Sequence, residues 1–160
     1  MVVERRVTVL GVGIDLVELA RVRRILGRRR EQAMAKFLSE SERTYVESRT
    51  DPVPHIAARI AAKEAVYKAL QALPGCRGVG WREIEVWRDD AGKPSVVLNG
   101  LAASAVAAHG PIQVHLSLTH THLTACAVAV LERREGGKTG GRQEIIPPDL
   151  PVFPSSRPPD

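Results

Sequence analysis

The stretch that decides the fold is residues 54–73, which read Pro-His-Ile-Ala-Ala-Arg-Ile-Ala-Ala-Lys-Glu-Ala-Val-Tyr-Lys-Ala-Leu-Gln-Ala-Leu. The stretch is rich in alanine and is followed directly by Pro74-Gly75, so it predicts one long helix over residues 55–73. Pro54 suits the first turn of that helix, where a missing N–H leaves no helical hydrogen bond unmade.

Shorter elements surround this helix. Before it, the apolar pattern predicts one strand and three helical segments, over residues 7–14, 16–27, 31–38 and 39–48. Ser39-Glu-Ser-Glu42 opens the last of these as a capping box. After the long helix, the pattern predicts two strand pairs on either side of a short helix over residues 101–108: 84–87 with 94–98, and 114–118 with 123–131. This order predicts an α+β fold in which a mostly antiparallel sheet packs against the long helix.

The chain has 160 residues, which is enough for one domain with a sizeable core. Aromatic residues make up only 4% of it, so we expect an aliphatic core. After Leu131 the composition changes, because six of the eleven prolines lie in residues 147–160 and few apolar side chains remain to offset the entropy of ordering. We therefore expect one domain over residues 1–132 and a disordered tail over residues 133–160.

Charge and apolar runs restrict the function classes. No apolar run approaches the roughly 20 residues of a membrane helix, and the first residues do not resemble a signal peptide, so we expect a cytoplasmic protein without a membrane partner. Cys76 and Cys126 lack metal-ligand spacing, and Cys126 is expected to be a small core residue. The net charge of +5 indicates an anionic partner, and charge alone is compatible with nucleic acid, a phosphate-bearing cofactor, a membrane or an acidic protein.

The first segment suited to chemistry is Gly11-Val-Gly13-Ile-Asp15, at the end of the predicted first strand. It lacks the third glycine of a dinucleotide fingerprint and the Gly-Lys-Ser/Thr of a P-loop, so both are rejected. The Asp15 carboxylate is costly to bury unless it caps the next helix or binds a cation, and the residues alone favour the cap.

The second segment is the charged part of the long helix. Glu64 and Lys68 are four residues apart and share a face, while Arg59 and Lys63 form an adjacent stripe. Spacing alone favours a surface ion pair, although the alanines around these residues also suit a charged cluster held in a cleft.

The third segment places His120 and His122 two residues apart between the last two strands. They are compatible with metal ligation, with phosphate binding or with ordinary turn positions, and no cysteine or third nearby histidine completes a zinc site.

In this order the three segments resemble the holo-acyl carrier protein synthase family of 4'-phosphopantetheinyl transferases. Gly11-Val-Gly-Ile-Asp15-Leu-Val-Glu18 is similar to the family's opening motif, and Arg59-x-Ala-Ala-Lys63-Glu64-Ala-x-x-Lys68 is similar to its Lys-Glu helix. Gly92-Lys-Pro94 and Leu116-Ser-Leu-Thr-His120 also fall where the family has matching segments. The resemblance spans about residues 9–131.

The resemblance implies an enzyme that transfers the 4'-phosphopantetheine arm of coenzyme A to a serine of an apo acyl carrier protein and releases 3',5'-ADP. It implies that Asp15 and Glu64 hold Mg²⁺ and that Lys68 contacts the pyrophosphate, these three forming the catalytic set together with His120. It also implies that Arg59, Lys63, Lys68 and His120 bind the coenzyme. A metal-bound water and either carboxylate remain open as the base that takes the serine proton.

The resemblance further implies a homotrimer with active sites between subunits, in which Arg59 and His120 serve a neighbour's metal site and Arg21 and Arg28 bind the carrier protein. The residues themselves also favour an acidic carrier protein as the partner, because residues 21–30 hold six arginines and no acidic residue. A nucleic-acid-binding module is the competing interpretation, but no aromatic residue lies among the arginines for base stacking, so we expect no nucleic-acid partner. The choice between carriers of fatty acid and polyketide synthesis stays open.

Overall fold

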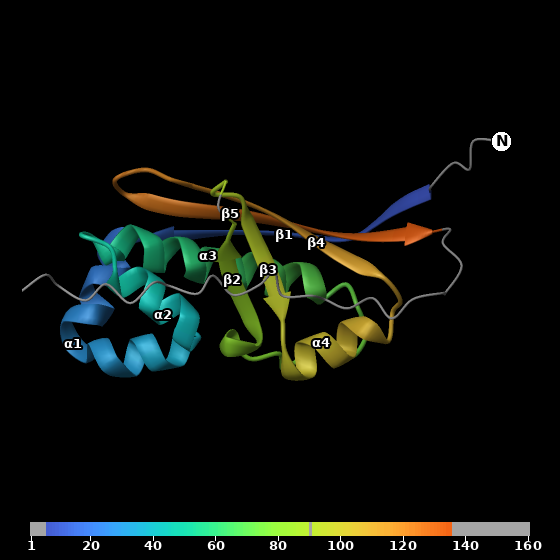
Figure 1. Ribbon diagram of the computed structural model, residues 1–160, viewed down its shortest axis with the longest axis horizontal. Coiled ribbons are helices and arrows are strands. Elements are labelled where there is room, and N and C mark those ends of the chain that lie inside the picture. Colours follow the sequence, from blue (N-terminus) through green and yellow to red (C-terminus); the bar gives the residue numbers. More distant parts are fainter. Residues whose placement is uncertain (1–5, 90, 136–160) are drawn as a thin grey trace, which may run out of the picture.

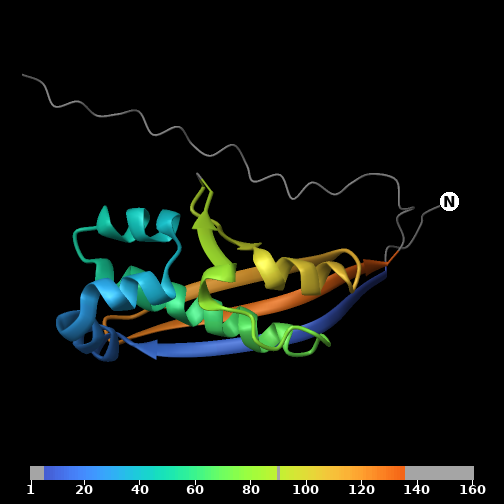
Figure 2. The same ribbon diagram turned by 90° about the horizontal axis from the view of Figure 1, so that it is seen from below.

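The structure is a computed structural model that describes residues 6–89 and 91–135. Its elements follow in the order β1 (Arg6–Glu18), α1 (Leu19–Phe37), α2 (Glu40–Glu47), α3 (Pro52–Leu70), the 3-10 turn η1 (Trp81–Glu83), β2 (Ile84–Arg88), β3 (Pro94–Leu98), α4 (Gly100–Ala107), β4 (Ile112–His120) and β5 (Thr124–Glu135). The helices and the β2–β3 hairpin lie on one side of the sheet formed by β1, β5 and β4 (Figures 1 and 2).

Both sheets are antiparallel, which confirms the α+β prediction. The larger one has the strand order β1-β5-β4, and the smaller one pairs β2 with β3. Helix α3 packs on the inner face of the larger sheet, where alanines of α3 such as Ala61 and Ala65 bury themselves against Ala127 and Ala129 of β5. The core of the described residues is aliphatic, as the composition predicts.

Two glycines of β1 allow α3 to approach the strand closely. A Cβ atom added at Gly13 would overlap the carbonyl oxygen of Ala65, and one added at Gly11 would overlap that of Ala69. Only glycine fits at these two positions, because backbone rather than a movable side chain occupies the space.

Several predicted boundaries are wrong. Strand β1 continues to Glu18 because it pairs with β5 as far as Thr124, so the helix predicted from residue 16 begins only at Leu19. The two helices predicted before residue 39 form one, interrupted at Arg29, whose φ of −150° and ψ of 54° are not helical. Helix α3 starts and ends earlier than predicted, with Asp51 accepting a hydrogen bond from Val53 N at its N-terminus.

Other predictions have mixed outcomes. The capping box of Ser39 and Glu42 is confirmed at the start of α2. Cys126 is only half-buried, because its buried neighbours Ala125 and Ala127 occupy the inner face of β5. Strand β5 runs to Glu135 and so extends past residue 132, where the domain was predicted to end and the tail to begin. The rest of the predicted tail, residues 136–160, lies outside the described residues. Across those described residues, no helix combines the length and the hydropathy needed to cross a membrane.

Candidate active site

Asp15 and Lys68 meet where α3 crosses β1. Lys68 Nζ donates hydrogen bonds to Asp15 Oδ1, 2.8 Å away, and to the carbonyl oxygen of Ile14, 3.0 Å away. The hydrogen bond to Asp15 raises the pKa of Lys68, so the amine is fully protonated at neutral pH. The Lys68 side chain is 49% exposed and that of Asp15 is 18% exposed, so the pair is open to a ligand from the Lys68 side.

The helix-cap interpretation of Asp15 is wrong. The residue before α1 is Glu18, which makes no side-chain cap hydrogen bond, whereas Asp15 lies inside β1 opposite Ala127 of β5. Gly11 and Gly13 let α3 come close enough for Lys68 to reach this carboxylate.

Glu64 lies one helical turn before Lys68 on α3 and is half-buried. Within residues 6–89 and 91–135 its carboxylate has no hydrogen-bond or ion-pair partner. Burial raises the pKa of Glu64, the charge of Asp15 raises it further, and the charge of Lys68 lowers it. Lys68 is paired with Asp15 alone, so the Glu64 carboxylate leaves a negative charge that a cation can neutralise.

This pair of carboxylates fits Mg²⁺. Magnesium binds oxygen and is usually held by one or two carboxylates, with waters and substrate phosphates completing its shell. No group of three or more His, Cys, Asp or Glu side chains that could hold a metal occurs in the described part of the chain, and His120 and His122 belong to none. A metal at Asp15 and Glu64 would need further ligands from water or a phosphate.

A pocket of about 240 Å³ lies beside Glu64. Its walls come from α3, from the segment between α3 and η1, and from η1 and β2. Its lining includes Lys63, Glu64, Tyr67, Val79, Trp81 and Ile84. Glu64 therefore lines a space large enough for part of a small-molecule substrate.

A separate basic cluster surrounds Tyr45 of α2. The guanidinium groups of Arg49 and Arg59 lie over its ring, 4.2 and 4.0 Å from the ring centroid, and the His55 ring meets it edge-on with centroids 5.7 Å apart. Burial lowers the pKa of His55, and the charges of Arg49, Arg59, Arg88 and His120 lower it further. The cluster thus concentrates positive charge, as an anion-binding site requires.

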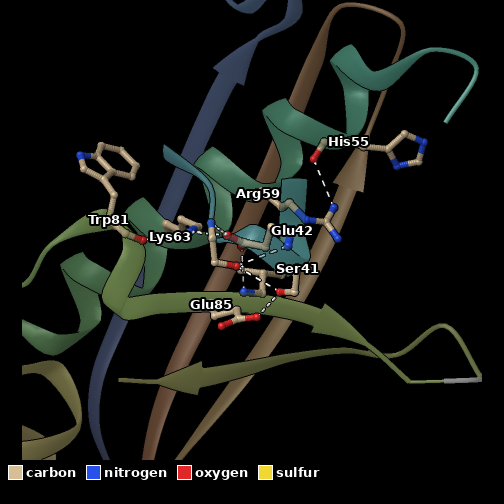
Figure 3. Close-up of polar contacts among 9 residues, drawn as sticks. Ser41, Glu42, His55, Arg59, Lys63, Trp81 and Glu85 are labelled. Carbon is tan, nitrogen blue, oxygen red and sulfur yellow. Dashed lines mark hydrogen bonds and ion pairs between the residues drawn. The ribbon is translucent and has the colours of Figure 1, made fainter. Parts of the chain in front are cut away.

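Arg59 is the buried member of this basic cluster. It is only 4% exposed, and one of its nitrogens, Nη1, donates to the carbonyl oxygen of His55 over 3.4 Å (Figure 3). Its buried Nε has no hydrogen-bond partner in the described residues. A buried donor without an acceptor is costly, and an anionic ligand would supply one.

Comparison with known proteins shows which family this chain belongs to. A family model described as the 4'-phosphopantetheinyl transferase superfamily matches residues 11–127. The chain is 44% identical to the holo-[acyl-carrier-protein] synthase of Anaeromyxobacter sp. (strain K), over 78% of this chain and 96% of that protein. The chain belongs to the holo-[acyl-carrier-protein] synthase family of 4'-phosphopantetheinyl transferases.

Solved structures of the family share the fold. The crystal structure of the synthase from Neisseria meningitidis superposes with a TM-score of 0.72 at 29% identity, covering 79% of this chain and 100% of that one. The synthase from Bacillus anthracis, solved in complex with CoA (3',5'-ADP), gives a TM-score of 0.63 at 32% identity, with 78% and 96% covered. Coenzyme A is thus a ligand of a structurally similar synthase.

The predicted site residues form two groups in the structure. Asp15, Glu64 and Lys68 form one group, whereas Arg59 belongs to the basic cluster around Tyr45, and the charge of His120 acts on His55 of that cluster. No contact described within residues 6–89 and 91–135 joins the two groups. In one subunit, the carboxylates and the basic cluster are therefore separate.

Lys63 belongs to neither group. Its amine is buried and donates to Glu42 Oε2 over 2.7 Å and to the carbonyl oxygen of Trp81 over 2.9 Å (Figure 3). Its predicted role in binding the coenzyme stays a prediction, and the observed contacts direct the amine toward Glu42 instead.

Arg21 and Arg28 lie exposed on α1, before the interruption at Arg29. Neither has an ion-pair partner in the described part of the chain, so both guanidinium groups are available to another molecule. By contrast, Arg23 on the same helix lies 3.9 Å from Asp51.

The sequence interpretation missed Arg49 and the second role of Glu42. Arg49 follows α2 in a segment without a motif, and only the stacking on Tyr45 shows its place. Glu42 was recognised as a capping residue, but its contact with Lys63 depends on how α2 packs against α3, which no local pattern shows.

Proposed function

We propose that this protein transfers the 4'-phosphopantetheine arm of coenzyme A to a serine hydroxyl of an apo acyl carrier protein. The observation that carries the proposal is the contact between Lys68 and Asp15 with Glu64 one turn away, formed by the two motifs that identify the family. The complex of the Bacillus anthracis synthase with CoA (3',5'-ADP) supports coenzyme A as the donor.

In this reaction the serine oxygen attacks the phosphorus that bears the pantetheine arm, and the bond to the bridging oxygen of the pyrophosphate breaks. The products are the phosphopantetheinyl serine and 3',5'-ADP, and the serine proton is released. Lys68, protonated and half-exposed, is placed to stabilise the charge that develops on the phosphate oxygens. Asp15 holds the Lys68 amine in position.

Asp15 and Glu64 would hold Mg²⁺ at this site. Their fit rests on the Glu64 carboxylate, which has no hydrogen-bond partner in the described residues and faces the charge of Asp15. When bound, the ion supplies positive charge that neutralises the pyrophosphate.

Arg59 and His120 bind the anionic end of the coenzyme in this proposal, near its 3'-phosphate. The unpartnered Nε of Arg59 and the nearby charge of Arg49 support this role. A phosphate accepts several charge-assisted hydrogen bonds, so it suits a cluster of guanidinium and imidazole groups.

The active protein is proposed to be a homotrimer with its sites between subunits. Strand β1 exposes a row of apolar side chains on the face of the sheet away from α3, including Val12, Ile14 and Leu16, each at least 60% exposed. An exposed apolar row of this kind favours association, which would bring the basic cluster of one subunit to the carboxylates of another.

The carrier protein is proposed to bind to α1 through Arg21 and Arg28, because exposed arginines suit the acidic surface that this partner is expected to present. The cytoplasmic location predicted from the sequence is part of the same proposal.

A transfer assay tests the proposed function. Incubated with coenzyme A, Mg²⁺ and an apo acyl carrier protein, the protein should add the mass of the phosphopantetheine arm to the carrier, as measured by intact mass spectrometry. Chelation of Mg²⁺, Asp15→Ala and Glu64→Ala should each abolish the mass shift. Wild-type rates in both variants would show that these carboxylates are not required.

A further inference from the structure

A buried ion pair joins Glu42 of α2 to Lys63 of α3. Lys63 is 1% exposed and so is Glu42, and the distance from Lys63 Nζ to Glu42 Oε2 is 2.7 Å. Together with Arg59 they are the buried charged residues of the described chain. Neither member of the pair takes part in the chemistry proposed above.

The pair connects four elements. Glu42 Oε2 also accepts a hydrogen bond from Ser39 N, 2.8 Å away, and Glu42 Oε1 accepts one from Val86 N of β2, 2.9 Å away. Lys63 Nζ donates in addition to the carbonyl oxygen of Trp81 in η1, 2.9 Å away. Figure 3 shows Glu42 and Lys63 between α3 on one side and the η1–β2 segment on the other.

These contacts adjoin the pocket beside Glu64. Trp81 and Ile84 of the η1–β2 segment line it, as do Glu64 and Tyr67 of α3. The Trp81 ring is fixed on its other side by an edge-on contact with Phe37, with centroids 5.0 Å apart. The hydrogen bond from Lys63 to Trp81 therefore joins the two walls directly, and Glu42 joins them indirectly by binding both Lys63 and Val86 N.

We propose that Glu42 and Lys63 are a positioning pair that sets the separation between α3 and the η1–β2 wall, and thereby the fit of coenzyme A in the pocket beside Glu64. The role as a determinant of coenzyme binding rests on the proposed function. The fixed position of Trp81 does not rest on the proposed function, because it follows from the contacts of Trp81 with Lys63 and Phe37.

The alternative is that Lys63 binds a phosphate of the coenzyme directly, as the family resemblance implies. To do so the amine would have to leave Glu42, and the buried carboxylate would then keep only the charge of Arg59, which acts on it without forming an ion pair. Breaking a buried pair in this way is strongly unfavourable, because a charge without its ion-pair partner stays in the interior. The observed pairing thus favours positioning over direct binding.

Steady-state kinetics of three variants separate the two roles. Glu42→Gln and Lys63→Met should each raise the KM for coenzyme A by about tenfold, while kcat changes by less than about threefold. The double variant should raise KM no further, because the two residues act as one unit. If Lys63 is a phosphate ligand, Glu42→Gln frees its amine and leaves KM unchanged or lower, while Lys63→Met alone raises it; that result would overturn the proposal.

Arg43→Gln is the matched control. Arg43 lies on the same helix, α2, and pairs with Glu31 over 2.6 Å and with Glu47 over 2.9 Å, but these pairs are partly exposed. Its loss should leave the KM for coenzyme A and kcat at wild-type values. Equal KM changes in Arg43→Gln and Lys63→Met would show a general effect of α2 rather than of the buried pair.

Trp81 fluorescence provides a readout that does not need activity. In a Trp87→Phe background Trp81 is the single tryptophan, since the chain has two. Acrylamide quenching should increase in both Glu42→Gln and Lys63→Met, and unchanged quenching in both would overturn the fixed position of Trp81. Should the wild-type protein show no transfer at all, the proposed function fails while this measurement still decides the positioning of Trp81.

Circular dichroism and thermal melting establish first that the variants are folded. If Lys63→Met does not fold, Glu42→Gln decides alone, because the positioning role requires a higher KM for coenzyme A and direct binding by Lys63 requires an unchanged or lower one.

Discussion

Lys68 of α3 and Asp15 of β1 are 53 positions apart in the chain, yet Lys68 Nζ lies 2.8 Å from Asp15 Oδ1. The same amine binds the carbonyl oxygen of Ile14, so it is held against the strand by two acceptors. This contact depends on Gly11 and Gly13, which let α3 lie directly on β1. The conformation of the strand and the chemistry of the site are therefore linked.

Replacing Lys68 by methionine should lower kcat by about a hundredfold or more, because a positioned charge near the phosphates is removed. The KM for coenzyme A should change less than kcat, since the stabilised charge develops in the transition state. Lys68→Arg keeps the charge and should retain part of the activity. Transfer kinetics measure both parameters, and an unchanged kcat in Lys68→Met would remove Lys68 from the catalytic set.

The tight packing at Gly13 predicts a large loss of stability in Gly13→Ala. The added Cβ would overlap the Ala65 carbonyl oxygen, so α3 and β1 must separate, at a cost of about 3 kcal/mol or more. Gly27→Ala is the matched control, because no atom lies within 4 Å of its added Cβ and α1 gains a better helix former, worth up to about 1 kcal/mol. Urea unfolding of both variants tests this difference, and equal stabilities would contradict the packing argument.

Local signals in the sequence predicted α2 and α3, although not the bounds of α3 or the extent of α1. The alanine-rich stretch with Pro74-Gly75 after it predicted α3, and Ser39 with Glu42 predicted the start of α2. The spacing of Glu64 and Lys68 placed them on one face, but only the family resemblance added Asp15 to them. The residues alone favoured a helix cap, because nothing local shows that pairing with β5 extends β1 to Glu18.

The surroundings of the charged residues could not be predicted. Arg59, Lys63, Glu64 and Lys68 share one helix, and only packing decides which face meets β1 and which meets α2. The structure turns Lys63 toward Glu42 and Lys68 toward Asp15, so neighbouring cations have different partners. Such differences arise from contacts between distant segments and leave no local pattern.

We expect Glu83 of η1 to stabilise the fold in a pH-dependent way. Backbone N–H groups of Gly80 and Leu101 donate to its carboxylate, both over 2.6 Å, and they lower the pKa of Glu83 below its ordinary value of 4.5. Its contribution is therefore present above pH 4.5 and is lost as the pH falls through the lowered value. The bond to Leu101 also caps α4, whose Asn99 makes no side-chain cap.

Glu83→Gln should consequently lower the stability at pH 7 by about 1 kcal/mol, since an amide cannot accept both hydrogen bonds. The difference from wild type should shrink as the pH falls below 4.5. Thermal melts across this range measure it. Glu40→Gln, at an exposed position in the first turn of α2, should follow the wild-type pH dependence. A Glu83→Gln difference independent of pH would show that the carboxylate charge does not contribute.

Charge reversal on α1 tests the proposed carrier surface. Arg21→Glu with Arg28→Glu should raise the KM for the apo carrier protein by about tenfold and leave the KM for coenzyme A unchanged. The effect should weaken at high salt, because these exposed charges are screened. Arg77→Glu with Arg82→Glu makes the same change in charge at exposed positions after α3 and should leave the carrier KM near wild type. Equal effects of the two double variants would indicate net charge rather than a surface on α1.

A charge introduced into the exposed apolar row of β1 tests the proposed trimer. Ile14 is 60% exposed, so Ile14→Lys places a charge in the proposed interface without disturbing the core, and light scattering should find a monomer where the wild type is a trimer. The Ile14→Lys monomer should also lose transfer activity, because the basic cluster and the carboxylates of one subunit are separate. Leu101→Lys, at another exposed apolar position on α4, should remain trimeric and active. A fully active monomer of Ile14→Lys would show that one subunit completes its own site.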